Sequence, residues 1–235
     1  MAAQRSARAD LHLGVSLALI AGALNAGGFI AIGQYTSHMT GMLSSAADNL
    51  ALGRVAPALL ALGSVAAFLA GAASTAVMIN YAKRSEARHV YAAPLLLEAA
   101  LLLGFGVAGA RLDGASPASM VATITLLCYV MGLQNALITK ISNAEIRTTH
   151  VTGLVTDIGI ELGKLVYWNG HPDAAGAPAV RANRRRLRVH LCIVAGFFVG
   201  GLGGALGFQH VGFAATIPLA VGLVVLAAAP WMRRA

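Results

Sequence analysis

The sequence predicts an all-α membrane protein. Six transmembrane helices form an inverted repeat of two three-helix halves, each with a short interrupted or re-entrant helix. Composition is the first evidence, because 57% of the 235 residues are hydrophobic and only 11% are charged, whereas soluble domains carry about 25% charged residues. The second is a series of six long apolar runs. The third is a motif that occurs twice, as SHMTG at 37–41 and as THVTG at 149–153.

A membrane-spanning helix needs roughly 20 mostly apolar residues, and the chain contains six such runs. They lie at about 11–33, 55–82, 91–110, 117–138, 189–207 and 211–232. If the N-terminus is cytoplasmic and only these runs cross, fifteen of the seventeen Lys and Arg residues fall on the cytoplasmic side. This bias predicts six spans with both termini cytoplasmic. Topology thereby explains the net charge of +8, and we expect no nucleic-acid partner.

The repeat extends beyond the two motifs. Each motif follows an apolar run that contains an Asn-Ala pair, and each opens a short amphipathic run, about 38–53 in the first half and 150–167 in the second. Phe68–Gly71 in the second span matches Phe198–Gly201 in the fifth. The linker 168–183, rich in Ala, Gly and Pro, accounts for the longer spacing in the second half.

Each half, 1–112 and 113–235, holds three spans. Because three is odd, the second half enters the membrane inverted. In transporters built this way, short or interrupted segments at matching positions mark the substrate site. The N-terminus of such a half-helix offers free N–H groups and a positive dipole end to an anion. The residues expected to bind the substrate are Asn25, Ser37, His38, Thr40, Gly41, Asn135, Thr149, His150, Thr152 and Gly153.

The alternative is that the two short runs are interfacial helices on opposite membrane surfaces, with Ser and Thr as ordinary caps. Ser and Thr before a helix accept hydrogen bonds from its free N–H groups, and Thr36, Ser37 and Thr40 suit that role in the first copy. His38 and His150 occupy equivalent positions. Two His residues without a nearby Cys or carboxylate set do not predict a metal site.

Two acidic residues are candidates for proton coupling. Glu98 lies inside the apolar run PLLLEAALLLGF, where a charge costs about 2.5–3.5 kcal/mol on insertion scales. Asp157 lies about one turn into the second short run. The alternatives are an interfacial or hydrogen-bonded structural role for Glu98 and, for Asp157, electrostatic stabilisation of its helix N-terminus. Glu161 shares a face with Asp157 and is placed to pair with Lys164.

The stretches AGALNAGGFIAIGQYTSHMTGMLSS and MGLQNALITKISNAEIRTTHVTGLVTDIG resemble the two signature regions of the YoaK-like family. Members of that family are polytopic proteins of the bacterial inner membrane that carry a domain of unknown function. The resemblance covers nearly the whole chain and implies a multi-pass protein of the bacterial inner (cytoplasmic) membrane, but it implies no substrate. In relatives the first signature typically reads MTGN, whereas Met42 replaces that Asn here. A role of the Asn side chain therefore does not carry over to this position.

These features together predict a secondary transporter or facilitator for a small polar or anionic solute, bound near the membrane midplane. An ion channel or passive pore, and a non-transport scaffold, sensor or assembly factor, are the alternatives. The sequence shows no Ser-His-Asp set, paired Cys ligands or phosphate loop, so we expect neither an enzyme nor a cofactor. The expected partners are the lipid bilayer and the solute. The glycines Gly196, Gly200 and Gly204 predict tight helix packing, either within the chain or in a homodimer.

Overall fold

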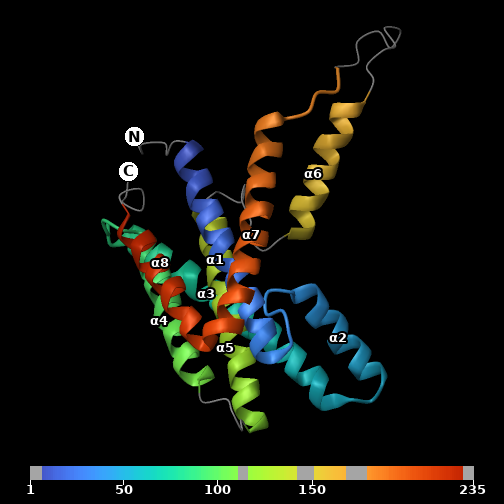
Figure 1. Ribbon diagram of the computed structural model, residues 1–235, viewed down its shortest axis with the longest axis vertical. Coiled ribbons are helices and arrows are strands. Elements are labelled where there is room, and N and C mark those ends of the chain that lie inside the picture. The colour runs from blue at the N-terminus through green and yellow to red at the C-terminus, as the bar shows by residue number, and fades with distance from the viewer. Residues whose placement is uncertain (1–6, 111–115, 142–150, 168–178, 230–235) are drawn as a thin grey trace.

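The computed structural model describes residues 7–110, 116–141, 151–167 and 179–229, and every regular element in these ranges is helical (Figure 1). The elements are α1 (Ala7–Ile32), α2 (Met39–Ala51), α3 (Val55–Arg84), α4 (Ala92–Gly109), α5 (Pro117–Ile141), α6 (Val151–Val166), α7 (Arg184–Val211), the 3-10 helix η1 (Gly212–Ala215) and α8 (Thr216–Ala228). Each predicted long or short run corresponds to one of them. The all-helical prediction is confirmed for this part of the chain.

Five helical stretches among the described residues are long and apolar enough to cross a membrane. They are the core of α1, then α3, α4, α5 and the continuous stretch Arg184–Ala228, which joins α7, η1 and α8. Several long apolar helices fit a multi-pass membrane protein. The predicted sixth span is shorter than expected, because Gly212 ends α7 with a φ of 60° and η1 follows it. The 13 residues of α8 extend about 20 Å, less than the roughly 30 Å of a bilayer core.

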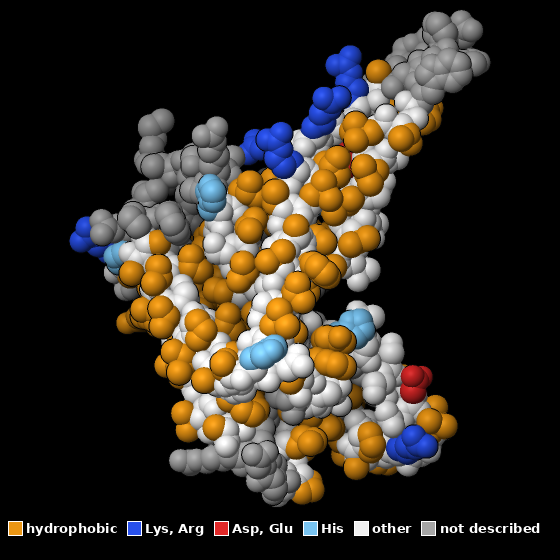
Figure 2. Space-filling model, in the orientation of Figure 1, with side chains coloured by type: hydrophobic (Ala, Val, Ile, Leu, Met, Phe, Trp, Pro, Cys, Tyr) orange, Lys and Arg blue, Asp and Glu red, His pale blue; other side chains and the backbone are white. Residues whose placement is uncertain are grey.

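The surface has the character of a membrane protein (Figure 2). Apolar side chains cover most of the visible face. Lys and Arg side chains gather at the upper end of α7, and a single one, Arg54, lies between α2 and α3 at the other end. Cations at the ends of an apolar band are the arrangement expected where helices meet the headgroup regions.

The helices α1 and α7 pack closely and run in the same direction (Figure 1). A Cβ atom on Gly22 would overlap the carbonyl oxygen of Phe197, and one on Gly200 would overlap the carbonyl oxygen of Leu19. The two backbones are therefore in direct contact, which only small residues allow.

A second crossing, between α3 and α5, has the same character. A Cβ atom on Gly132 would overlap the carbonyl oxygen of Phe68, and one on Gly71 would overlap the carbonyl oxygen of Tyr129. One turn further along α3, the hydroxyl of Thr75 donates a 2.9 Å hydrogen bond to the carbonyl oxygen of Leu133. Each long helix of the first half thus has its main contact with a helix of the second half.

The three glycines that were candidates for a dimer seam face α1 of the same chain. Gly196 lies against Val15, while Gly200 and Gly204 lie against the next two turns of α1. All three are buried. Their spacing therefore serves packing within the chain.

The two short helices pack on the outside of this bundle, α2 along α3 and α6 along α7. In Figure 1, α2 and α6 lie toward opposite ends of the molecule, and each begins near the middle and runs outward. The starts of both helices therefore face the central zone from opposite directions.

Candidate functional site

The connection between α1 and α2 folds back on the last turns of α1. Gly33, with a φ of 71°, turns the chain after α1 ends. The rings of Phe29 and Tyr35 then stack with their centroids 4.6 Å apart. Two residues later, the hydroxyl of Ser37 donates a 2.9 Å hydrogen bond to Oδ1 of Asn25, and its backbone N–H donates to the same oxygen at 3.3 Å. These contacts fix where α2 begins.

Thr36 lies between these two contacts and is completely buried. A Cβ atom on Gly28 would lie 3.6 Å from its Oγ1, so the side chain packs against α1. This hydroxyl has no hydrogen-bond partner among the described residues. The prediction that Ser and Thr side chains cap the first short helix is wrong for the N-cap itself, because that residue is His38 and its side chain makes no capping bond.

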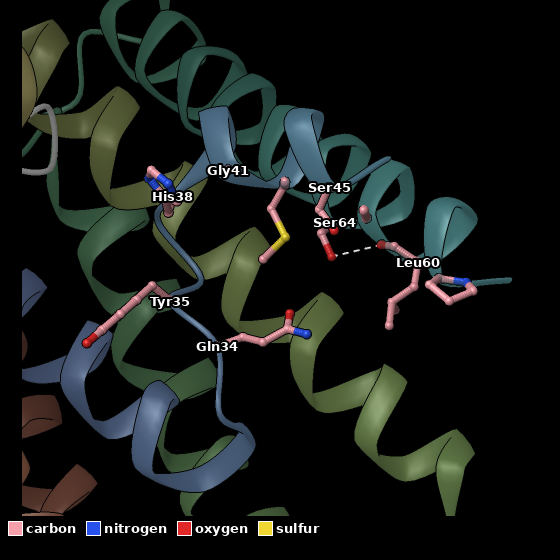
Figure 3. Close-up of a pocket in the computed structure, with 10 residues that line it drawn as sticks. Gln34, Tyr35, His38, Gly41, Ser45, Leu60 and Ser64 are labelled. Carbon is pink, nitrogen blue, oxygen red and sulfur yellow. Dashed lines mark hydrogen bonds between the residues drawn. The ribbon is translucent and has the colours of Figure 1, made fainter. Parts of the chain in front are cut away.

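A pocket of about 270 Å³ opens beside the start of α2, between that helix, α3 and the preceding loop (Figure 3). In Figure 3 the Gln34 side chain reaches across toward α3, and His38 stands at the start of α2. The lining residues are Gln34, Tyr35, His38, Gly41, Met42, Ser45, Pro57, Leu60, Ala61 and Ser64.

The pocket combines an apolar wall with a few hydrogen-bonding groups. The Ser64 hydroxyl donates to the carbonyl oxygen of Leu60 at 2.9 Å, so its oxygen can still accept. The Ser45 hydroxyl oxygen accepts from the Asn49 amide at 3.2 Å, so its own proton can still be donated. Among the described residues, no Asp, Glu, Lys or Arg lines the pocket. Such a site suits a small solute that forms hydrogen bonds and has an apolar part.

Sequence reasoning found only part of this pocket. His38 and Gly41 line it as predicted substrate contacts, whereas Thr40 is exposed and does not line it. The missed residues are Gln34, Tyr35, Met42, Ser45, Pro57, Leu60, Ala61 and Ser64. Of these, Ser64 is the residue that the sequence could have indicated, because it is polar and lies inside a mostly apolar span.

The second copy of the motif is described only in part. Thr149 and His150 lie outside the described residues. Thr152 and Gly153 are exposed at the start of α6, and nothing lies within 4 Å of a Cβ atom placed on Gly153. Asn135 is buried on α5, where its amide donates to the carbonyl oxygen of Met131 at 2.9 Å.

Glu98 is completely buried in the middle of α4. Neither of its carboxyl oxygens has a hydrogen-bond partner among the described residues. The amide of Gln134, on the neighbouring helix α5, is also fully buried and has none within the same part of the chain. Buried polar groups are normally paired, so Glu98 and Gln134, like Thr36, are exceptions among the described residues.

The remaining acidic candidate, Asp157, contacts α7 rather than the pocket. Its Oδ2 accepts a hydrogen bond from Nη2 of Arg186 at 3.0 Å. One turn further along α6, Glu161 pairs with Lys164 at 2.9 Å, as predicted, and accepts from the backbone N–H of Asn183 at 2.6 Å. The Lys164 ammonium and this N–H hold the pKa of the Glu161 carboxyl below its ordinary value, because both stabilise the charged form.

Within the described residues, no three His, Cys, Asp or Glu side chains come together as a metal site. No curated protein and no solved structure matches the chain significantly. A family model described as a protein of unknown function (DUF1275) matches residues 13–229. Because this match spans most of the chain, the protein belongs to the DUF1275 family.

Proposed function

We propose that the protein is a secondary transporter or facilitator that carries a small polar or anionic solute across the bacterial inner membrane. The fold is an inverted repeat of three plus three helices, and α2 and α6 are its re-entrant half-helices. The YoaK-like resemblance of both signature regions supports this membrane assignment. Three features of the structure support the transport mechanism.

The first feature is the correspondence between the two helix crossings. Gly132 follows Gly22 by 110 positions, and the Cα atom of each glycine lies against the carbonyl oxygen of a Phe residue in its partner helix. Those carbonyls belong to Phe68 and Phe197, which are 129 positions apart. The contacts thus support the repeat in a register one residue from the Phe68–Phe198 match of the sequence.

The second feature, the pair of short helices, carries the proposal. Each begins at its copy of the repeated motif and packs on the equivalent long helix, α2 on α3 and α6 on α7. The molecular outline is notched between the lower end of α6 and the upper end of α2 (Figure 2). Half-helix ends that meet near the midplane from opposite sides are typical of transporters with inverted repeats.

The pocket beside α2 defines the class of solute. Its volume of about 270 Å³ lies below the roughly 300–1,000 Å³ of pockets for drug-sized ligands, so the solute is small. The described residues that line it include no carboxylate that would balance a cation. The N-terminus of α2 at the pocket favours negative charge through its free N–H groups. A neutral polar molecule or a small anion fits these conditions.

The third feature is the buried carboxyl of Glu98, which supplies the proton coupling. A buried acid without an ionic partner is neutral or charged according to its surroundings, and the two forms differ strongly in solvation. Intramembrane acids of this kind occur in proton relays. We assign coupling to Glu98 rather than Asp157, because Arg186 already holds the Asp157 carboxylate.

The test is solute uptake into proteoliposomes that contain the purified protein, with a panel of small neutral polar and monoanionic solutes. We expect saturable uptake and counterflow of at least one solute, without single-channel conductance. Conductance would favour the pore. If the folded protein moves none of the panel and stably captures a protein partner, the scaffold interpretation is correct.

Two adjacent serines provide a matched control for the pocket. Ser45→Leu places a large side chain in the pocket, and we expect uptake to fall at least tenfold. Ser44 is exposed on the same helix and does not line the pocket, so Ser44→Leu is expected to retain uptake. Equal effects of the two substitutions would refute this site.

Replacing Glu98 separates coupling from binding. Glu98→Gln keeps the shape of the side chain and removes its titration. We expect it to abolish accumulation driven by a pH gradient while counterflow at equal pH on both sides persists. Retained accumulation in the variant would assign coupling to another residue.

A further inference from the structure

The contact between α6 and α7 contains a cluster of charged side chains that the proposed function has not used. Oδ2 of Asp157 lies 3.0 Å from Nη2 of Arg186 and 3.9 Å from Nδ1 of His190. The His190 side chain is only 4% exposed. Its Nδ1 atom has no hydrogen-bond partner among the described residues. We call these three residues the α6–α7 cluster.

Fixed sequence offsets relate the helices of the first half to those of the second. The repeated motif relates α2 to α6 by 112 positions, from His38 to His150. The glycine contacts relate α3 to α7 by 129 positions. The same relation pairs Arg54 with Asn183, and these are the N-cap residues of α3 and α7. The register of 129 positions therefore holds both at the start of the two long helices and near their middle.

With these registers, the α6–α7 cluster occupies the counterpart of the pocket. Three residues that line the pocket have small or compact side chains, and their three counterparts are the members of the cluster. The pairs are Ser45 with Asp157, Pro57 with Arg186, and Ala61 with His190. The space between α2 and α3 is thus a cavity. The corresponding space between α6 and α7 is bridged by the Asp157–Arg186 ion pair and the buried imidazole of His190.

In an inverted repeat the two crevices open toward opposite sides of the membrane. Alternating access moves one half against the other around a central site, so a state with one crevice open has the other closed. The structure has this asymmetry, with the pocket open between α2 and α3 and the cluster closing the space between α6 and α7.

We propose that the α6–α7 cluster is the inner gate of the transport path. The Asp157–Arg186 pair and His190 hold the start of α6 on α7 while the pocket is open, and their separation opens the inner crevice. Glu161 is the pivot, since it accepts a hydrogen bond from the backbone N–H of Asn183, the N-cap residue of α7, and so holds the C-terminal part of α6 in place. This inference rests on the proposed transport function.

Leu154 provides a reporter of the gate that needs no solute. It is 5% exposed, and of the residues of α6 only Leu154 and Glu161 are buried. α7 is the main packing partner of α6, so Leu154 becomes accessible when α6 leaves α7. The experiment measures alkylation of Leu154→Cys by a small water-soluble thiol reagent in the reconstituted full chain. Cys192→Ala removes the partly exposed native thiol, and Cys128 is buried.

We expect slow alkylation in this parent. Asp157→Asn or Arg186→Gln is expected to raise the rate at least tenfold, and the exchanged pair Asp157→Arg with Arg186→Asp to restore protection. Glu161→Gln is the matched control, because it removes a charged side chain of α6 that pairs with Lys164 on the same helix and accepts from the N-cap residue of α7, and we expect its rate to stay near that of the parent. Unchanged rates in both single variants, or an equal rise in Glu161→Gln, would overturn the gate.

Hydrogen exchange keeps the test decisive if Leu154→Cys does not fold. In a chain with Leu154 intact, amides at the start of α6 are expected to exchange faster in Asp157→Asn than in Glu161→Gln, and equal rates would contradict the gate. Both readouts are independent of solute flux. A protein that transports nothing but shows this pattern would retain the gate and lose the proposed function, and the converse result would do the opposite.

Discussion

Two glycines on α3 have opposite surroundings although the sequence presents them alike. A Cβ atom on Gly71 would overlap a backbone carbonyl of α5, whereas nothing lies within 4 Å of one on Gly63. We expect Gly71→Ala to lower the free energy of unfolding by about 1–3 kcal/mol, as overpacking does. Gly63→Ala is expected to be neutral or to stabilise by up to about 1 kcal/mol, because Ala favours helix. Denaturant titration in detergent measures both, and similar losses would contradict the close crossing.

The hydrogen bonds between Asn25 and Ser37 give a second prediction at the residue scale. Asn25→Ala removes both bonds, whereas Ser37→Ala leaves the one from the backbone N–H. We expect costs of about 0.5–1.5 kcal/mol, with Asn25→Ala the larger and the double variant close to Asn25→Ala alone. The free energies of unfolding of the four chains measure this coupling, and full additivity would show that the two side chains act independently.

The residues of the site differ in how far a sequence can reveal them. The duplicated motif singled out His38 and Gly41, which line the pocket, because repetition is visible in a sequence. Ser45 was missed because nothing in a helical pattern shows which neighbouring helix a serine faces. Asp157 was assigned to proton coupling, yet its partner Arg186 lies 29 positions away across a linker whose path a sequence does not specify.

At the scale of elements, the attachment of the C-terminal part of α6 to the start of α7 depends on the ionisation of Glu161. Its folded-state pKa is lowered by Lys164 and by the N–H of Asn183, so its contribution to stability is complete above the unfolded pKa, about 4.3. That contribution is lost as the pH falls through the lower folded pKa. We expect the thermal midpoint of Glu161→Gln to lie below that of the unmodified chain at pH 7 and to converge with it toward pH 3. Parallel curves would exclude this role.

The positions of the helices followed from hydropathy more closely than their lengths did. Hydropathy indicates where apolar chain begins and ends, and α3, α4 and α5 lie close to the predicted runs. The sixth run was expected to begin at 211, whereas α8 begins at Thr216, because periodicity does not show that Gly212 takes a positive φ and is followed by a 3-10 turn. The sequence also could not show which residues of two packed helices face each other. Phe197 and Phe198 both follow the Phe-x-x-Gly pattern of Phe68, and only the contact with Gly22 shows that Phe197 is the counterpart.

At the scale of the whole molecule, the two halves are interleaved rather than side by side. The main partner of α1 is α7, that of α3 is α5, and that of α4 is α8, so each long helix of one half packs on the other half. The division into 1–112 and 113–235 follows the proposed repeat, but the glycine contacts that hold the backbones together cross from one half to the other.

This interleaving predicts how the halves behave when separated. Expressed alone, either 1–112 or 113–235 exposes the helix faces that carry the close glycine contacts, so we expect each to be aggregated or degraded. Expressed together, they are expected to assemble and co-purify as a monodisperse complex with the thermal midpoint of a folded protein. Gly71→Ala in the first half should weaken this assembly, whereas Gly63→Ala should not, because only Gly71 meets a backbone of the second half. A half that is stable and monodisperse alone would show that the repeats are independent units.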